Sequence, residues 1–401
     1  MKLTAIHSAI LLSLIPTTAT FAAGLDRSGQ SISAFLQPGN YAEAGLSVLD
    51  PEVQGKDNAG NNISDMADDY YFPSAAVKIQ ATDKISVGLL YDQPYGADSQ
   101  YPTDAGAFGN GTEGTGVKVR TNNITALLGY QPTENWNVYA GPVYQTVKAN
   151  ISLRGDAYSL LSGYDIHIKQ KDAYGWVAGF AYQIPEIALK AAVTYRSEIK
   201  HKTNAVETSN LAVLGASLPA TGHPLSTAKP ILATLGYKES TVDTTTPQSV
   251  NVDLQTGIAA NTLVFANLRW VHWDQFAVKP ALLAQASALA KGKAQNLIDY
   301  SDDQYSITAG LSRKFTDKWA STVAIGWDSG AGNPVTTLGP TEGYWSVGLG
   351  GQYSPAENYF IQAGVKYFWL GDAQAQTGGV VKGNFEDNTA LGYGMKIGYR
   401  F

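Results

Sequence analysis

The sequence predicts an all-β fold, an antiparallel transmembrane β-barrel of about 14 strands with long extracellular loops. Three observations support it: apolar residues recur with a period of two, short turns alternate with long loops, and Trp and Tyr stand at both ends of the apolar faces. Outer-membrane barrels combine these features because lipid-facing and lumen-facing positions alternate along each strand. Aromatic girdles flank their apolar band.

The C-terminal segment 389–401 shows this pattern most clearly. One face is wholly apolar: Leu391, Tyr393, Met395, Ile397, Tyr399 and Phe401. The opposite face carries three glycines with Lys396 and Arg400. Eleven residues rise about 36 Å, and a tilt near 45° leaves an apolar band about 25 Å tall, as in outer-membrane barrels. Taken alone, this segment also fits an edge strand of a soluble sandwich, so the remaining segments must decide.

The alternation of short turns and long loops predicts the number of strands. Short turns are predicted at 82–84, 132–135, 184–187, 259–261, 316–318 and 354–358. Long gaps fall near 55–70, 96–116, 153–171, 201–247, 275–302, 328–342 and 371–387. Six turns and seven loops join fourteen strands, and an even number places both termini on the periplasmic side. Residues 280–298 break the period of two and are rich in helix formers, which predicts a short external helix.

The N-terminus has the features of a secretory signal peptide over residues 1–22. Lys2 precedes an apolar run at 9–15, and Thr20-Phe21-Ala22 resembles a cleavage site. The apolar run is too short to span a bilayer. A lipoprotein would need a cysteine at the cleavage site, and the chain has none. These features predict export and a location in the bacterial outer membrane.

Composition and motifs exclude several classes of function. The chain has no cysteine and a net charge of −6, which argues against thiolate metal sites and nucleic-acid binding. The GxGxxG pattern at 109–114 opens no helix, and no GxSxG motif occurs. We interpret the acidic groups 65–69 and 299–303 as solvated loop charges rather than calcium sites. We therefore expect no enzyme activity, no cofactor and no metal.

Several cations fall on the predicted inward faces of strands: Lys190, Arg196, Arg269, Lys366 and Lys396. Ionisable groups inside a barrel line a pore or hold a ligand. Arg269 lies near the apolar Phe265. A guanidinium in such surroundings is suited to bind a carboxylate that carries an apolar chain. A structural ion pair with Glu198, Asp253 or another lumen acid is the alternative. Arg269, Arg196, Lys190 and Phe265 are the candidate lumen ligand-binding residues.

Two parts of the chain resemble a known family. These are the block 246–276, which closes with Trp273-Asp274-Gln275-Phe276, and the N-terminal stretch 23–53, which contains Val48-Leu-Asp-Pro-Glu-Val53. Both resemble the FadL/TodX/OmpP1 family of outer-membrane transporters for long-chain fatty acids and aromatic hydrocarbons. The resemblance implies a fourteen-strand barrel plugged by an N-terminal hatch. We expect the hatch at 23–39 and the barrel at 40–401.

The resemblance also implies a ligand path. The ligand enters an apolar groove between the third and fourth outer loops, moves to a lumen pocket, and leaves sideways through a kink in the third strand. Here the groove would use five leucines: Leu160, Leu161, Leu211, Leu214 and Leu218. The third strand is expected at about 85–95, where Pro94 lacks a ladder donor and Gly96 follows.

The hatch departs from the family pattern. The family carries an Asn-Pro-Ala motif there, whereas the candidate here is Asn40-Tyr41-Ala42, without the proline. The predicted hatch is also short, which leaves its closure of the lumen open.

The resulting expectation is passive uptake of hydrophobic compounds, with long-chain fatty acids favoured. A monoaromatic hydrocarbon channel and a general porin are the alternatives. The expected partners are the hydrophobic ligand and outer-membrane lipid, and the protein is expected to be a monomer.

Overall fold

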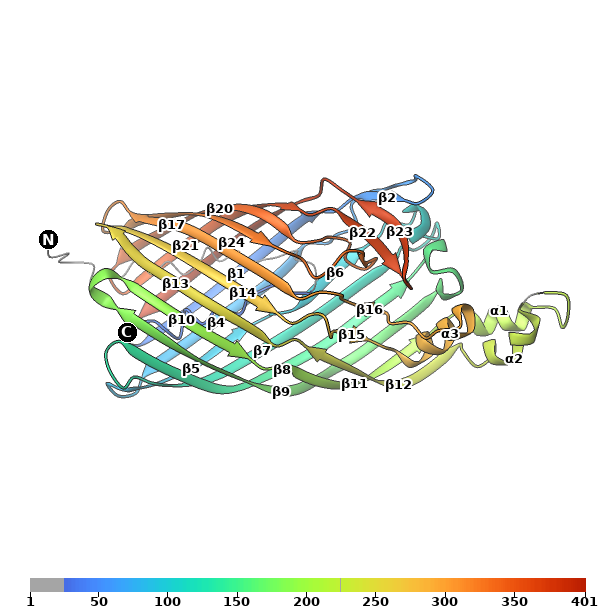
Figure 1. Ribbon diagram of the computed structural model, residues 1–401, viewed down its shortest axis with the longest axis horizontal. Coiled ribbons are helices and arrows are strands. Elements are labelled where there is room, and N and C mark those ends of the chain that lie inside the picture. Colours follow the sequence, from blue (N-terminus) through green and yellow to red (C-terminus); the bar gives the residue numbers. More distant parts are fainter. Residues whose placement is uncertain (1–24, 224) are drawn as a thin grey trace.

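The structure is a computed structural model that describes residues 25–223 and 225–401, so the predicted signal peptide lies outside the described residues. Within them, seventeen strands form one closed sheet (Figure 1). Three crossings of the barrel wall are each split into two strands: β5 with β6, β10 with β11, and β12 with β13. Seventeen strands less three give fourteen crossings, which confirms the predicted fourteen-strand antiparallel barrel.

The first eight crossings contain β1 (Tyr41–Glu52), β4 (Tyr70–Gln80), β5 (Ile85–Asp92), β6 (Gly96–Gln100), β7 (Gly116–Tyr130), β8 (Trp136–Leu153), β9 (Tyr164–Ile184), β10 (Leu189–Arg196), β11 (Ile199–Thr208), β12 (Tyr237–Thr246) and β13 (Ser249–Ala259). The remaining six are β14 (Thr262–Val271), β17 (Gln304–Lys314), β18 (Trp319–Asp328), β20 (Tyr344–Ala356), β21 (Tyr359–Leu370) and β24 (Thr389–Arg400).

The barrel closes where β24 pairs antiparallel with β1, from Tyr41 opposite Arg400 to Glu52 opposite Thr389. Closure leaves no edge strand, as expected in a bilayer, whose interior offers backbone groups no water. The predicted alternation along β24 is confirmed: Met395 is 54% exposed, whereas the neighbouring Lys396 is buried.

All six predicted short turns are confirmed by the ends of the flanking strands, and the C-terminus lies at the same end of the barrel (Figure 1). The predicted bounds of the long loops were partly wrong. The predicted loop 153–171 contains the start of β9, and 201–247 contains most of β11 and β12. In this part of β9, Tyr164, Ile166 and Ile168 are buried, whereas the residues between them are polar or half-exposed. The apolar face points inward there, so the lipid-facing pattern does not apply.

The loops at the opposite end form a cap with small elements of its own. One sheet joins β2 (Gly55–Asp57), β3 (Asn62–Ile63), β19 (Val335–Thr336), β22 (Ala373–Thr377) and β23 (Val380–Phe385), and a second pairs β15 (Ala277–Val278) with β16 (Ile298–Asp299). The helices are α1 (Leu211–Ser217), α2 (Lys229–Leu232), α3 (Ala281–Lys291), and the 3₁₀ turns η1 (Gly106–Phe108), η2 (Asp156–Leu161), η3 (Pro185–Ile187) and η4 (Ser226–Ala228). α3 confirms the helix predicted within 280–298.

Aromatic side chains form the core beneath this cap. Phe108 and Tyr101 stack with their ring centroids 4.8 Å apart, and Phe385 contacts both rings. Helices α1, α2 and α3 extend beyond the barrel at the loop end (Figure 1). Among the described residues, no helix is long and apolar enough to cross a membrane.

Candidate ligand chamber and wall opening

Residues 25–40, called the hatch segment below, run through the interior of the barrel. Lys78 on β4 donates a hydrogen bond to the carbonyl of Gln37, and Lys190 on β10 donates to that of Leu36, each at 2.9 Å. These two strands lie on distant parts of the barrel wall. The hatch segment is therefore fastened to the lumen surface at several points around it.

Arg269, on the lumen face of β14, is fully engaged by the hatch segment. Its Nε lies 2.6 Å from Oδ2 of Asp26, and one Nη donates to Gln30 at 3.1 Å. The other Nη donates to Asn251 on β13 at 2.7 Å. This guanidinium fixes the N-terminal end of the hatch segment, so it does not face an open chamber.

The third crossing is interrupted between β5 and β6, at residues 93–95, where the sequence predicted a break. Here the chain pairs with the hatch segment, while Tyr95 keeps its hydrogen bonds to Thr121 of β7. The N–H of Arg27 donates to the carbonyl of Pro94 at 2.7 Å, and the N–H of Gly96 donates to that of Leu25 at 2.8 Å. The interruption thus turns the third crossing toward the lumen.

This turn opens the wall between β4 and the third crossing. Residues 75–80 of β4 pair with β5, whereas within the described chain 70–74 form ladder pairs with β1 alone. An isolated bridge from Ala67 to Ser99 joins the two sides again beyond the opening. This gap in strand pairing lies in the barrel wall itself, beside the lumen, and is called the wall opening below.

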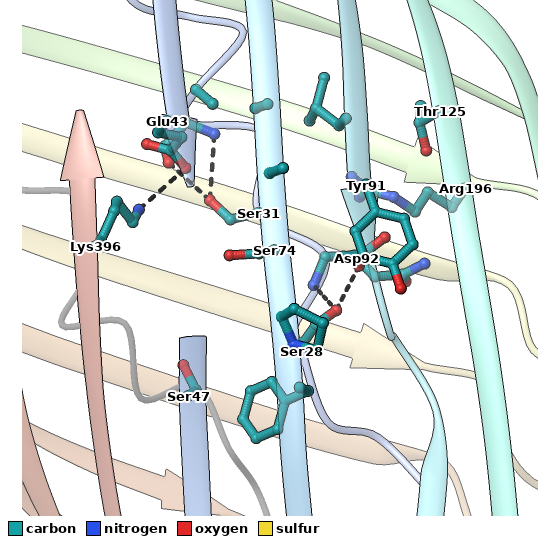
Figure 2. A pocket seen from close by; sticks show the side chains of 18 residues that line it. Ser28, Ser31, Glu43, Ser47, Ser74, Tyr91, Asp92, Thr125, Arg196 and Lys396 are labelled. Carbon is teal, nitrogen blue, oxygen red and sulfur yellow. Dashed lines mark hydrogen bonds and ion pairs between the residues drawn. The ribbon is translucent and has the colours of Figure 1, made fainter. Parts of the chain in front are cut away.

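A cavity of about 100 Å³ lies next to the opening (Figure 2). The hatch segment and both sides of the opening contribute to its lining, through Ser28, Ser31, Phe72, Pro73, Tyr91 and Asp92. Ser28 Oγ donates to Asp92 Oδ2 at 2.5 Å, which ties the hatch segment to the end of β5. We call this cavity the chamber.

Arg196 is one of two cations that line the chamber (Figure 2). Its side chain is 6% exposed, and its Nη1 has no hydrogen-bond partner among the described residues. The other cation of the lining, Lys396, is paired with Glu43 at 3.1 Å. A buried guanidinium with an unfilled donor is costly, so the chamber favours an anionic or hydrogen-bond-accepting group at Arg196.

The structure therefore separates the four predicted lumen residues. Arg196 lines the chamber, whereas Lys190 and Arg269 are bound to the hatch segment. Phe265 lies away from the chamber, with its ring over Gly310, where an added Cβ would come within 2.5 Å of the ring. Only Arg196 remains as a candidate contact for a ligand in the chamber.

The five predicted groove leucines are brought into one packed hydrophobic cluster beneath the loops. Leu211 and Leu218 are buried in it, and the partly buried residues packed against it include Leu160, Leu161 and Leu214. A packed cluster presents no groove, so capture there would require these loops to separate. The exposed apolar side chains are instead Val213 and Ile231, at 72% and 52%.

The predicted hatch motif lies mostly in the barrel wall. Tyr41 and Ala42 belong to β1, paired with Arg400 and Tyr399 of β24. Asn40 precedes the strand, and its Oδ1 accepts a hydrogen bond from the N–H of Gln80 at 2.9 Å. Tyr41 and Ala42 are therefore ladder residues rather than plug residues, because strand pairing at the closing seam begins at Tyr41.

Sequence reasoning missed most of the chamber lining. Ser28 and Ser31 come from a segment without periodicity, and serine carries no distinctive signal. Asp92 was detectable, because a carboxylate immediately before the predicted break at Pro94 stands at the rim of any opening formed there.

Comparison with known proteins identifies the family. The family described as "Outer membrane protein transport protein (OMPP1/FadL/TodX)" matches residues 30–401. The chain belongs to this family. FadL/TodX proteins are outer-membrane transporters of hydrophobic compounds, so this member is a transport protein and not an enzyme. No curated protein sequence matches the chain.

Solved structures of FadL/TodX proteins share the fold at low sequence identity. A Pseudomonas aeruginosa FadL homologue superimposes with a TM-score of 0.71 at 15% identity, over 97% of this chain and 99% of the other. The P. putida toluene transporter TodX gives 0.62 at 12%, over 92% and 91%. The Ralstonia pickettii toluene transporter TbuX gives 0.60 at 15%, over 98% and 99%. At such identities the likeness supports the barrel fold alone.

Proposed function

We propose that this FadL-family member carries long-chain fatty acids passively across the outer membrane and releases them sideways through the wall opening. The observation that carries the proposal is the buried guanidinium of Arg196, whose Nη1 has no partner among the described residues and which lines the chamber beside the opening. A carboxylate is the group that a guanidinium binds best, through charge-assisted hydrogen bonds.

The shape of the site supports release toward lipid. A cavity of about 100 Å³ holds a head group but not a long acyl chain. With its carboxylate at Arg196, the ligand extends its chain past Pro73 and Tyr91 through the wall opening. Each buried CH₂ contributes about 0.8 kcal/mol, so contact of the chain with bilayer lipid drives its exit.

The orientation in the membrane is part of the proposal. The short turns, the start of β1 and the C-terminus share one end of the barrel, and we assign this end to the periplasm (Figure 1). The loop cap with α1, α2 and α3 then faces outward, where ligands first meet the protein.

Monoaromatic hydrocarbons are the second candidate. The small chamber favours a compact ligand, and two similar structures are those of toluene transporters. A neutral hydrocarbon would leave Arg196 without a partner, which favours the fatty acid. A general porin is disfavoured because the hatch segment occupies the lumen.

Binding of oleate and of methyl oleate to the purified protein in detergent tests the proposal. The ester has no carboxylate, so we expect wild type to bind oleate about 10- to 100-fold more tightly than methyl oleate. This ratio corresponds to the free energy of one charged hydrogen bond. Arg196→Gln should remove this preference, whereas the control Arg313→Gln, at an exposed position, should keep it. Equal affinity for acid and ester in wild type would exclude the carboxylate role.

A further inference from the structure

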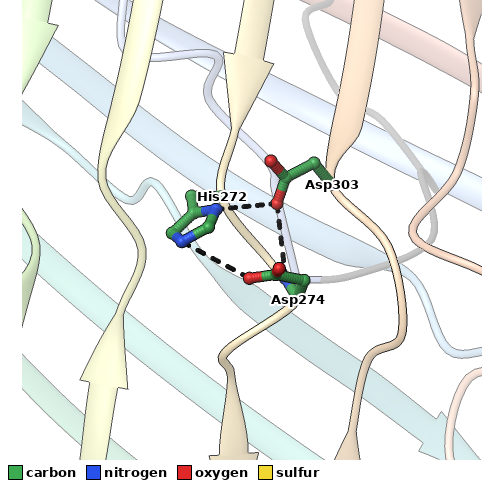
Figure 3. Close-up of side chains that lie close together, drawn as sticks. All are labelled: His272, Asp274 and Asp303. Carbon is green, nitrogen blue, oxygen red and sulfur yellow. Dashed lines mark hydrogen bonds and ion pairs between the residues drawn. The ribbon is translucent and has the colours of Figure 1, made fainter.

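A cluster of three side chains lies at the base of the loop that carries α3 (Figure 3). His272 directly follows β14, and Asp303 directly precedes β17, so they mark the two ends of the loop 272–303. Asp274 is the third member. One ligand atom of each residue lies within 4.8 Å of the other two. The cluster shares no residue with the chamber lining.

Asp303 is held as a hydrogen-bond acceptor. Its Oδ2 accepts the indole N–H of Trp270 at 2.8 Å, and its Oδ1 accepts the backbone N–H of Asp274 at 3.4 Å. The same Oδ1 lies 2.9 Å from Nδ1 of His272. Because the carboxylate can only accept, Nδ1 must carry the imidazole proton in this contact.

This assignment leaves an unusual contact on the other side of the ring. Nε2 of His272 lies 3.3 Å from Oδ1 of Asp274. In a neutral imidazole whose proton is on Nδ1, Nε2 is a lone pair, and the carboxylate oxygen is an acceptor as well. Two acceptors at this distance repel unless a cation lies between them. The cation must be either a second proton or a metal ion.

We propose that His272 Nε2 and Asp274 Oδ1 bind a divalent transition-metal ion of the zinc class, with Asp303 orienting the imidazole. Two ligand atoms 3.3 Å apart, each about 2.1 Å from a metal, subtend about 104°, close to a tetrahedral angle. A mixed nitrogen and oxygen ligand set suits Zn²⁺ better than Ca²⁺ or Mg²⁺. Metal-bound histidines almost always donate their other N–H to a carboxylate, the role of Asp303 here.

The proposed ion would fix the start of the α3 loop. It would bind His272 and Asp274, which both stand at that start, and the contact of His272 Nδ1 with Asp303 connects them to the end of the loop. Asp274 is 45% exposed, which lets the ion enter from solvent and leaves its remaining positions to water. The pair of Val271 with Gln304 already closes this loop at its base, so the ion would order the first residues after β14.

Zinc titration of the full chain in detergent, followed by calorimetry at pH 7.5, tests the proposal. We expect one Zn²⁺ per wild-type chain and a loss of affinity of about 10- to 100-fold in Asp274→Asn and in Asp303→Asn. The matched control is His167→Gln, an exposed histidine on β9 outside the cluster. Hydrogen exchange over residues 273–276 should slow on addition of Zn²⁺ in wild type and in His167→Gln, but not in Asp274→Asn.

Two outcomes would overturn the proposal. Absence of stoichiometric Zn²⁺ binding by wild type would mean that a proton alone bridges His272 and Asp274. Equal binding by wild type and Asp274→Asn would place the ion elsewhere. Heat-modifiable migration on gels confirms that each variant keeps a folded barrel, so a lost site is distinguished from a lost fold.

Discussion

Arg269 on β14 and Asp26 of the hatch segment form a buried ion pair across the lumen. Nε and Oδ2 are 2.6 Å apart, and the two side chains are 4% and 3% exposed. Asp26 also pairs through its backbone with Tyr95, at the interruption of the third crossing. The pair therefore connects the barrel wall at β14 to the hatch and, through it, to the side of the barrel that carries the opening.

Removing the charge of Asp26 should release this end of the hatch. Asp26→Asn leaves Arg269 buried without its ion pair, and breaking such a pair costs about 3–5 kcal/mol. We expect faster hydrogen exchange over residues 25–36, measured by mass spectrometry. Asp104→Asn, at an exposed loop position, should leave exchange unchanged.

The double variant Asp26→Leu/Arg269→Met separates charge from packing. An apolar pair of similar volume can replace a buried ion pair at little cost, so protection of 25–36 should return. Continued rapid exchange in the double variant would show that Arg269 fixes the hatch through Gln30 or Asn251 instead.

Gly96 at the start of β6 is expected to tolerate no side chain. A Cβ there would stand 1.9 Å from the hydroxyl oxygen of Tyr70, on the β4 side of the wall opening. We expect Gly96→Ala to lower the free energy of unfolding by about 1–3 kcal/mol, the usual cost of overpacking. Thermal unfolding in detergent measures it. Gly351→Ala, where no atom lies within 4 Å, is the control.

Tyr70→Phe in the Gly96→Ala background tests the assigned clash. The hydroxyl is the nearest obstacle, so its removal should restore part of the lost stability. A double variant no more stable than Gly96→Ala would mean that the backbone, rather than Tyr70, resists the new methyl group.

Much of the barrel was predictable because the bilayer imposes a period of two on every crossing. The face of β24 that contains Met395 fits contact with lipid once the same pattern recurs along the other crossings. The same logic failed at the start of β9, where Ile166 and Ile168 turn inward outside the lipid-facing region. The period of two alone does not show at which residue a strand leaves the lipid-facing region.

The site was predictable only on the barrel side. Alternation predicted an inward orientation for Arg196, Lys190 and Arg269. In the structure Lys190 and Arg269 bind the hatch segment, and Arg196 lines the chamber. Their division into a chamber residue and two hatch-bound residues depends on the path of residues 25–40. That path follows from long-range hydrogen bonds, which leave no periodic signal in the sequence.

Glu207, near the end of β11, should hold α3 against the barrel. Its carboxylate is fully buried and accepts the N–H groups of Ala281, Leu282 and Leu283, together with the hydroxyl of Tyr164. A negative charge at a helix N-terminus is stabilising, and charged hydrogen bonds contribute about 1.5–3 kcal/mol. Glu207→Gln should therefore make α3 susceptible to limited proteolysis.

The control for this change is Glu239→Gln, at an exposed position on the neighbouring β12. It should leave the cleavage pattern of wild type intact. Cleavage within 281–291 at the wild-type rate in Glu207→Gln would mean that apolar packing of Leu282 and Leu283 alone holds the helix.

Glu342, in the loop before β20, predicts a pH-dependent loop. Burial raises its pKa from 4.5 to about 7, and nearby Asp302 acts in the same direction, although the N–H of Gly332 donates to Oε1 at 2.9 Å. Between pH 4.5 and 7 the folded loop binds a proton that the unfolded chain does not. Stability of the loop must therefore fall as pH rises through this range and stay low above it.

Hydrogen exchange over residues 330–343, corrected for the intrinsic rate at each pH, measures this loss. Protection should be greater at pH 5 than at pH 8 in wild type. Glu342→Gln keeps a neutral side chain of the same size, so its protection should depend less on pH over this range than that of wild type. If wild type and Glu342→Gln show the same pH dependence, another group controls the loop.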